Sequence, residues 1–396
     1  MTADKKTYSK RIIAIVLMIV ALLSSVWFMQ KFMCIPFSYD ERRIINIHKE
    51  PENTIDVVLV GSSATYAGFS SVYAYEKYGF TSFPYAIGGA TCTSWKPAVK
   101  DILHTQSPKL VVVDVFGGGY SRDLIDERHN QLSIIMSHTK LSREKVESAK
   151  ELSTLTDNIT PISFLVPFIK YHNNVPSCVR SLPERLRIEF TEASPLKGID
   201  TKTRTRKLKK VDPASFSEDC LELDNKTEEI ILDFIDYCKS ENIKILFVKY
   251  PSVLTNNNPD ELEVNLRANS ILKLAADSGC YALNMQKDFY EIGLVEKKDY
   301  YNHGHTNIRG QRKVTETLGK FIQDEIAINP SVLDESNKRK WDDCIPYYYA
   351  YCELAEEMIQ NEIHYELGDS PKLVDNLNRM LAGEDVAAVA KSYRKK

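Results

Sequence analysis

Two short segments, far apart in the chain, carry residue types that can perform acyl transfer. The first, Gly-Ser-Ser at residues 61–63, follows an apolar run at residues 55–60. The second lies about 240 residues later and places an asparagine and two histidines within residues 302–305. A serine hydroxyl becomes a strong nucleophile when an imidazole accepts its proton and a third polar group orients that imidazole. The two segments therefore predict a nucleophile and a general base, provided that the fold brings them together.

The position of the serines allows two interpretations. A serine at the tip of a buried strand that leads into a helix is presented at the edge of the sheet, where the helix N-terminus offers N–H groups to a developing oxyanion. A serine in the same place can also do no more than cap the helix. The tripeptide alone leaves both interpretations open.

Residues 58–63 (Val-Leu-Val-Gly-Ser-Ser) resemble the first sequence block of the SGNH/GDSL hydrolase superfamily, in the G-S-S variant of its membrane-anchored bacterial envelope members. Alignment with the family's G-D-S places Ser63 at the nucleophile and Ser62 at the aspartate. Residues 299–310 resemble the last block, D-x-x-H, in which His305 takes the position of the general base. His303 matches no family position, so we expect it to be a neighbour of the site.

The sequence departs from the family pattern at the residue that orients the histidine, which is Asn302 instead of aspartate. An amide oxygen can hold the imidazole tautomer but supplies no negative charge, and Asp-to-Asn in a serine triad can cost ~10⁴ in rate. Three alternatives follow. Asp299 replaces the missing carboxylate, or Ser63 and His305 act as a dyad, or catalysis has been lost.

The resemblance also implies donors for an oxyanion hole, namely the Ser63 amide and the amide of Gly89, which lies in a segment similar to the second family block. The third block normally supplies an asparagine, but Gly118 stands in its place. Asn130 is a candidate substitute, and an ordinary loop residue is the simpler interpretation of it. Tyr250 is expected to line the acyl pocket.

The elements that must position these residues alternate between strands and helices. This alternation predicts a mostly parallel sheet with helices on both faces, with the site at the carboxyl ends of the strands. The resemblance implies a flavodoxin-like, three-layer α/β/α domain of the SGNH type. The predicted strands are residues 55–60, 82–87, 110–116, 243–248 and 281–284, and the predicted helices are residues 95–105, 227–242, 261–278 and 310–328.

The SGNH-like domain is expected to span residues 54–330. Residues 120–225 are too long for a plain loop and are predicted to be a partly helical insertion that caps the strand ends. Seven Lys or Arg residues fall within residues 197–210, which form either a solvated loop or a patch for an anionic polymer or the membrane surface. Residues 331–396 are predicted to form a helical extension packed on the domain or on a partner.

The N-terminus contains the longest apolar run in the chain. Residues 12–28 carry no charge, and residues 12–33 are long enough to cross a ~30 Å hydrocarbon core. Four Lys or Arg residues precede them, so residues 1–11 are predicted to be cytoplasmic and the main domain extracytoplasmic. The alternative is a cleaved signal peptide, but the run is longer than a usual signal and lacks an A-x-A-like end. We therefore expect a single-pass anchor in the cell membrane.

Composition argues against several other classes of protein. The net charge of -3 disfavours a nucleic-acid binder. The eight cysteines include no C-x-x-C pair, which disfavours zinc. They are expected to be mostly buried free thiols, with Cys344 and Cys352 the nearest candidates for a disulfide. No G-x-G-x-x-G turn supports a dinucleotide-binding domain. The resemblance implies no metal or diffusible cofactor.

The predicted function is that of a membrane-anchored serine esterase or O-acyltransferase. The resemblance implies acyl esters, above all acetyl esters, of a cell-envelope polysaccharide or other O-acylated polymer as substrate. A transferase would work beside a multi-pass membrane acyl donor. The alternative is a catalytically degenerate SGNH-like protein that binds an envelope glycan or a membrane acyltransferase partner, and Asn302 and Gly118 motivate it.

Overall fold

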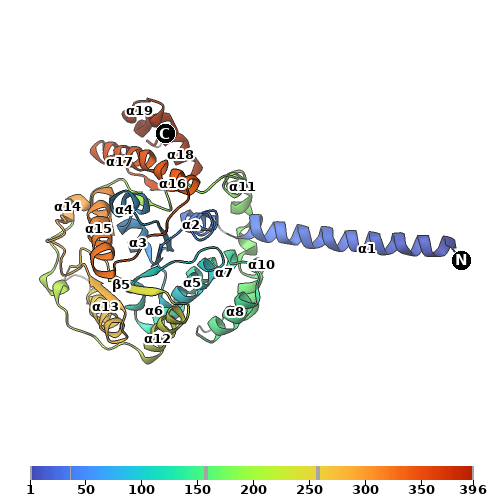
Figure 1. The fold of residues 1–396 in the computed structure, drawn as a ribbon, viewed down its shortest axis with the longest axis horizontal. Helices are drawn as coiled ribbons and strands as arrows, with labels where there is room; N and C mark the ends of the chain where they lie inside the picture. The colour runs from blue at the N-terminus through green and yellow to red at the C-terminus, as the bar shows by residue number, and fades with distance from the viewer. Residues whose placement is uncertain (1, 36, 156–158, 256–258, 395–396) are drawn as a thin grey trace.

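The protein is built around one five-stranded parallel sheet, which we describe from a computed structural model (Figure 1). The structure describes residues 2–35, 37–155, 159–255 and 259–394. The strand order, β2-β1-β3-β5-β6, is that of flavodoxin-like folds, and the predicted α/β fold class with a mostly parallel sheet is confirmed. The strands are β1 (Val57–Gly61), β2 (Ser82–Ala86), β3 (Leu110–Asp114), β5 (Lys244–Lys249) and β6 (Tyr281–Asn284).

Helices cover both faces of this sheet and give it two hydrophobic cores. Because successive side chains of a strand point to opposite faces, Val58 and Val60 enter one core while Val57 and Leu59 enter the other. The first core includes side chains from α5 (Trp95–Ile102), α12 (Asn225–Ser240) and α13 (Pro259–Asp277). The second includes side chains from α4 (Ser71–Tyr78) and α15 (Ile308–Phe321). This arrangement is a three-layer α/β/α domain.

The long insertion after β3 is helical, but it does not simply cap the strand ends as the sequence predicted. Of the described residues of the insertion, only Tyr120 and Arg128, near its start, line a cavity at the carboxyl edge of the sheet. Two of its later helices, α10 (Pro167–Tyr171) and α11 (Val175–Phe190), pack instead against residues 29–34 at the end of the N-terminal helix (Figure 1). The physical reason is that their apolar side chains cover the segment that leaves that helix.

The C-terminal extension packs on the domain through a core of its own. Its helices are α16 (Glu335–Asp342), α17 (Cys344–Gln360), α18 (Pro371–Leu381) and α19 (Val386–Lys391). Apolar side chains of α17, α18 and α19 share this core with Val72 and Tyr73 of α4, while Trp341 of α16 belongs to the first core of the sheet. A short strand of the extension, β9 (Glu366–Gly368), pairs antiparallel with β4 (Asp200–Lys202) of the insertion. The seven cysteines whose side chains the structure describes are free thiols, and Cys344 and Cys352 lie on one continuous helix, α17.

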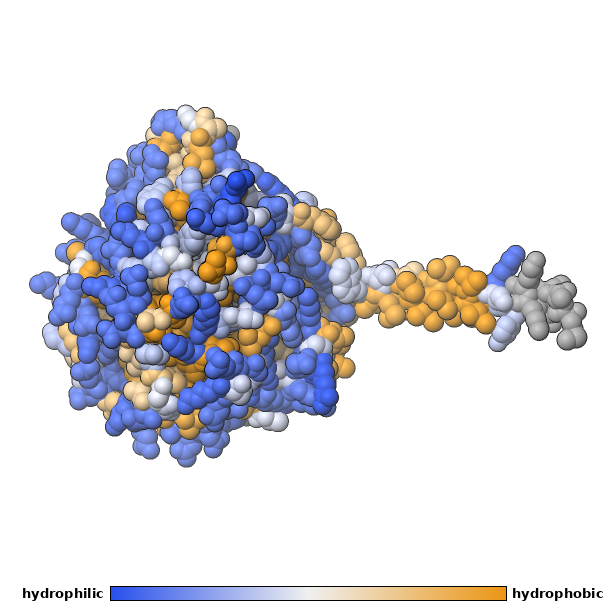
Figure 2. Space-filling view, in the orientation of Figure 1, coloured by the Kyte–Doolittle hydropathy of each residue, from blue (hydrophilic) through white to orange (hydrophobic). Residues whose placement is uncertain are grey.

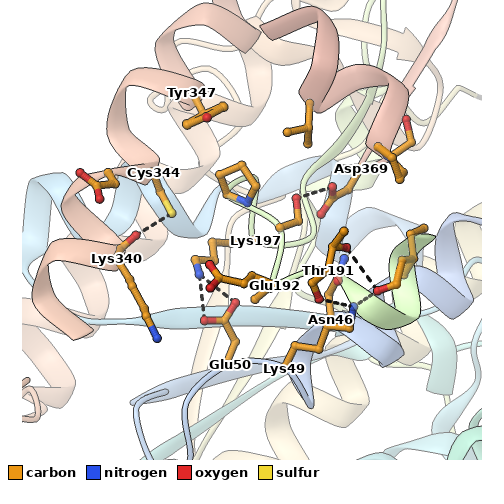
Figure 3. Close-up of a pocket in the computed structure, with 18 of the residues that line it drawn as sticks. Asn46, Lys49, Glu50, Thr191, Glu192, Lys197, Lys340, Cys344, Tyr347 and Asp369 are labelled. Atoms are coloured by element: carbon orange, nitrogen blue, oxygen red, sulfur yellow. Dashed lines mark hydrogen bonds and ion pairs between the residues drawn. The ribbon is translucent and has the colours of Figure 1, made fainter. Parts of the chain in front are cut away.

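A polar cavity of about 450 Å³ lies where the extension meets α2 (Tyr39–Ile47), the residues that follow it and the loop before β4 (Figure 3). The Lys197 ammonium points at Glu50 from 2.8 Å, and both side chains are buried. Lys197 also lies 4.8 Å from the centre of the Trp341 ring of α16. This buried ion pair therefore stands at the junction between the domain and its extension.

The N-terminal helix α1 (Thr2–Phe28) projects away from the domain (Figure 1). Within the described residues, Tyr8–Met33 is the one helical stretch long and apolar enough to cross a membrane, and its most apolar window of 18 residues is not covered by the rest of the protein. Its apolar surface is continuous in Figure 2. By length and composition, this helix could be a membrane span or a signal sequence.

Candidate active site

Ser63 is held at the carboxyl end of β1 by a tight turn into the short helix α3 (Ser63–Gly68). Gly61, before the turn, has φ of 153°, and a side chain there would meet the Cβ of Asp114 at 2.4 Å. Ser62 is the helix N-cap, and its hydroxyl accepts the Ala64 N–H at 3.3 Å. Capping thus falls to Ser62, while Ser63 lines a cavity.

The turn is fastened to the neighbouring strand by Asp114, the last residue of β3, a role that the sequence analysis missed. Its carboxylate accepts hydrogen bonds from the Ser62 hydroxyl at 2.5 Å, the Ser62 N–H at 3.2 Å and the Phe116 N–H at 3.0 Å. Burial raises the pKa of Asp114. Ser62, which stands at the family's aspartate position, is therefore directed at a buried carboxylate.

His305 comes from a small hairpin of β7 (Tyr300–Asn302) and β8 (His305–Thr306), just before α15. Its Nε2 lies 2.5 Å from the Ser63 Oγ, and its Nδ1 lies 2.7 Å from the Asn302 Oδ1. The Gly304 N–H also donates to this Oδ1 at 3.1 Å, so the amide presents its oxygen to the ring. Nδ1 therefore carries the proton, and Nε2 is free to accept the serine proton.

The surroundings of His305 keep its imidazole neutral. Burial, and secondly the charge of Lys202, lower the pKa of His305 to about 4. The Tyr301 ring stacks on the imidazole, with the ring centres 5.4 Å apart and the planes 7° apart. A half-buried neutral imidazole with a serine hydroxyl on Nε2 has the form that a general base requires at neutral pH.

The two other candidates near this hairpin have different partners. The Asp299 carboxylate accepts the Val295 N–H and the Lys313 ammonium, each at 2.7 Å, so it does not take the place of the missing orienting aspartate. His303 lines the cavity, but its Nδ1 lies 3.2 Å from the Val253 carbonyl oxygen. His303 is thus a neighbour of the Ser63–His305 pair.

Ser63 and His305 open into a cavity of about 260 Å³ at the carboxyl edge of the sheet. Gly89 lines it with φ of +72°, a conformation that favours glycine, and its amide donates no hydrogen bond to the described residues. That N–H is thus available to an oxyanion. The remaining wall mixes aromatic and charged side chains, namely Phe116, Tyr120, Arg128, Lys249, Tyr250 and Glu261.

The third oxyanion donor is not where the family pattern places it. Gly118 packs into the core, where an added Cβ would lie 2.8 Å from the Ile271 side chain and 3.3 Å from that of Trp95. The side chain of Asn130 lies outside the described part of the structure. A different residue of the same segment, Arg128, enters the cavity instead.

Arg128 stands beside the candidate oxyanion glycine. Its Nη1 would lie 3.2 Å from a Cβ added at Gly89, and its guanidinium carbon lies 4.3 Å from the centre of the Tyr120 ring. Among the described residues, it forms no ion pair with a carboxylate within 4.0 Å. Arg128 was not among the residues predicted from the sequence, although it lies two residues before Asn130.

A second cation of the cavity wall, Lys249, is the last residue of β5 and is buried. Its ammonium donates to the Asn269 Oδ1 at 2.6 Å and to the Asn265 carbonyl at 3.1 Å. Burial lowers the pKa of Lys249 to about 7. Near neutral pH, this side chain therefore exchanges between charged and neutral forms at the edge of the cavity.

Comparisons with known proteins give only distant likenesses. No protein-family model matches the chain, and no curated protein does. Among solved structures, a proposed acylhydrolase from Bacteroides fragilis is 12% identical over 69% of this chain and 89% of that protein, with a TM-score of 0.33. A variant of an acetyl xylan esterase from Geobacillus stearothermophilus is 11% identical over 72% and 100%, with a TM-score of 0.34. An active-site mutant of a family two carbohydrate esterase from Clostridium thermocellum is 9% identical over 70% and 65%, with a TM-score of 0.32.

Proposed function

We propose that this protein is a serine esterase or O-acyltransferase that forms an acyl-enzyme on Ser63. The observation that carries the proposal is the relay from the Ser63 hydroxyl to His305 Nε2, and from His305 Nδ1 to Asn302, at the mouth of a cavity. Nucleophile, base and orienter within hydrogen-bond reach of one another are the arrangement that acyl transfer needs.

The proposed reaction has two halves. Ser63 attacks the ester carbonyl while His305 takes its proton, and the Ser63 and Gly89 amides bind the oxyanion. His305 then protonates the leaving oxygen, which leaves an acyl group on Ser63. Water as the second acceptor gives hydrolysis, and a sugar hydroxyl gives transfer. The small cavity, with Phe116 and Tyr250 in its wall, suits a short acyl group such as acetyl.

We further propose that α1 anchors the chain in the cell membrane, with the catalytic domain outside the cytoplasm. The apolar stretch of Tyr8–Met33 and the four cations within residues 5–11 support this orientation. The substrate is then an O-acylated polymer of the cell envelope, and a transferase would receive its acyl group from a multi-pass membrane partner. Residues 54–330 would form the catalytic unit.

A fluorophosphonate probe, which reacts with activated serines, tests the nucleophile. We expect labelling of the full chain, loss of labelling in Ser63→Ala and retained labelling in the matched variant Ser62→Ala, read by mass spectrometry of the labelled peptide. Labelling that persists in Ser63→Ala but disappears in Ser62→Ala would overturn the assignment.

The second candidate function is a non-catalytic protein that binds an envelope glycan or a membrane partner. The neutral Asn302 and the core position of Gly118 are the observations that favour it. The same experiment separates the two candidates, because a binding protein would show no probe labelling in the unmodified chain.

A further inference from the structure

Exposed apolar side chains gather on the part of the domain next to α1. Outside α1, the described residues include twelve exposed large apolar side chains. Five of the twelve fall within residues 161–190, which are less than a tenth of the chain. They are Ile162, Phe168, Ile169, Val179 and Phe190, with between 40% and 82% of their surface exposed. Soluble surfaces rarely group such side chains without a partner to cover them.

These side chains belong to α9 (Pro161–Leu165), α10 and α11. Of these helices, α10 and α11 contact the chain where it leaves the apolar helix, and α9 packs against α10. The Ile35 carbonyl accepts the Arg185 guanidinium at 2.6 Å and the Cys178 thiol at 3.2 Å. The buried Ile35 packs with Tyr171 of α10. The apolar face and the end of the helix are therefore held in one arrangement.

The figures show the same relation. In Figure 1, α10 and α11 lie at the root of α1, on the side of the domain that faces along that helix. In Figure 2, apolar patches lie on the flank of the domain beside the root of α1. A surface that adjoins the end of a membrane-crossing helix meets the membrane interface before it meets any other partner.

We propose that the face formed by α9, α10 and α11 is a second membrane contact, which embeds Phe168 and Ile169 in the interfacial layer of the lipid bilayer. This proposal rests on the proposed anchoring by α1 and goes beyond it. Apolar side chains that enter the interface lose their contact with water, which favours binding in proportion to the buried apolar area. A single helix leaves a domain free to tilt, whereas two contacts fix how the catalytic edge faces the membrane.

The test uses the full chain in phosphatidylcholine vesicles, with the exposed Cys220 changed to serine. An environment-sensitive fluorophore is attached to Phe168→Cys in one sample and to Tyr349→Cys in the other. Tyr349, on α17, is the matched control, because 42% of it is exposed against 40% of Phe168. We expect blue-shifted emission and quenching by a spin-labelled lipid at position 168 only.

An alkaline wash of the same vesicles separates this proposal from the anchor. If the chain stays in the vesicles but the label at position 168 emits as it does in water, the second membrane contact is wrong and the anchor by α1 still stands. If the wash releases the chain from the vesicles, both the anchor by α1 and the second membrane contact are wrong. Unchanged thermal melting of the two labelled variants shows that the substitutions left the fold in place.

Discussion

At His305, the group that orients the imidazole is the neutral amide of Asn302. A positive charge, that of Arg128, lies instead beside Gly89, the candidate oxyanion donor. Asn302 holds the tautomer without a charge that would stabilise imidazolium. Arg128 places a guanidinium next to Gly89. In the proposed reaction, proton transfer creates a cation on His305 as it creates an anion on the substrate, and the Arg128 charge would favour the anion.

The first residue-scale prediction concerns pH. Catalysis needs neutral His305, and a pKa of about 4 means that kcat/KM falls as the pH drops through about 4 rather than through about 6.5, the usual histidine value. In Asn302→Asp, a carboxylate next to Nδ1 favours imidazolium, so the acid limb moves to higher pH and activity is kept or raised. A pH profile on a small acetyl ester measures both effects.

The control for this prediction is Lys202→Gln, which removes the second cause of the lowered pKa. It is expected to move the acid limb upward by less, because burial is the larger cause and remains. An Asn302→Asp enzyme that is inactive, with His305 still in place, would show that Asn302 is not a weakened orienter.

The second residue-scale prediction concerns Arg128. If its guanidinium binds the oxyanion, Arg128→Ala lowers kcat by about 10²–10³ with little change in KM, which is the usual effect of removing one oxyanion donor. Arg128→Lys is expected to recover part of that loss. Steady-state kinetics on a small neutral ester measure it, and Arg143→Ala, at an exposed arginine of α8 (Arg143–Leu155), is the control. An unchanged kcat would exclude Arg128 from the reaction.

At the scale of elements, the basic segment of residues 197–210 separates into two parts. Lys197 is buried with Glu50, and Lys202 pairs with Glu366 at 3.0 Å. The other five cations are exposed, on an extended strap of residues 203–211. The Arg206 N–H donates to the Tyr300 carbonyl at 3.3 Å, so the strap runs beside the hairpin that carries His305.

The element-scale prediction is that this strap recognises an anionic polymer. Changing Arg204, Arg206 and Lys207 together to glutamine is expected to raise KM several-fold for an anionic acylated polymer at low salt, and to leave a small neutral ester unaffected. Exposed charges act over a Debye length of about 10 Å at 0.1 M salt, so the effect should fade as salt rises. The triple change of Lys150, Lys273 and Lys338 is the control. Equal KM values for both triple variants would identify the strap as a solvated loop.

The sequence predicted the elements whose signal is local. The strands were recognisable because a buried parallel strand is a continuous β-branched run, as in β1 and β3. Ser63 and His305 were recognisable because their short segments resemble the first and last blocks of the SGNH/GDSL superfamily, although His305 follows no strand of the main sheet. Asp114 and Arg128 were missed because a single charged residue has no local pattern that reveals its partner. The position of α10 and α11 was missed because it depends on contacts with residues 29–35, more than a hundred residues away.

At the scale of the whole molecule, the Lys197–Glu50 pair joins the domain to its C-terminal extension. Lys197→Met leaves a buried carboxylate without its cation, which is expected to cost about 3–5 kcal/mol in the free energy of unfolding. Because burial already raises the pKa of Glu50, protonation of the unpaired acid limits that loss. Urea unfolding measures it, and the double variant with Glu50→Gln should recover most of it. Full stability in Lys197→Met alone would contradict the role of the pair.

The short antiparallel pair of β4 and β9 connects the C-terminal extension to the surroundings of His305. Glu366 of β9 holds Lys202 of β4, Lys202 lies 5.7 Å from the centre of the Tyr301 ring, and Tyr301 stacks on His305. An electrostatic influence on the base is therefore set by a residue more than sixty positions downstream of it. The tail and the domain that carries the five-stranded sheet are therefore joined by contacts that reach the surroundings of His305. Trimming the tail would expose the edge of β4 and alter the protonation of the general base in a single step.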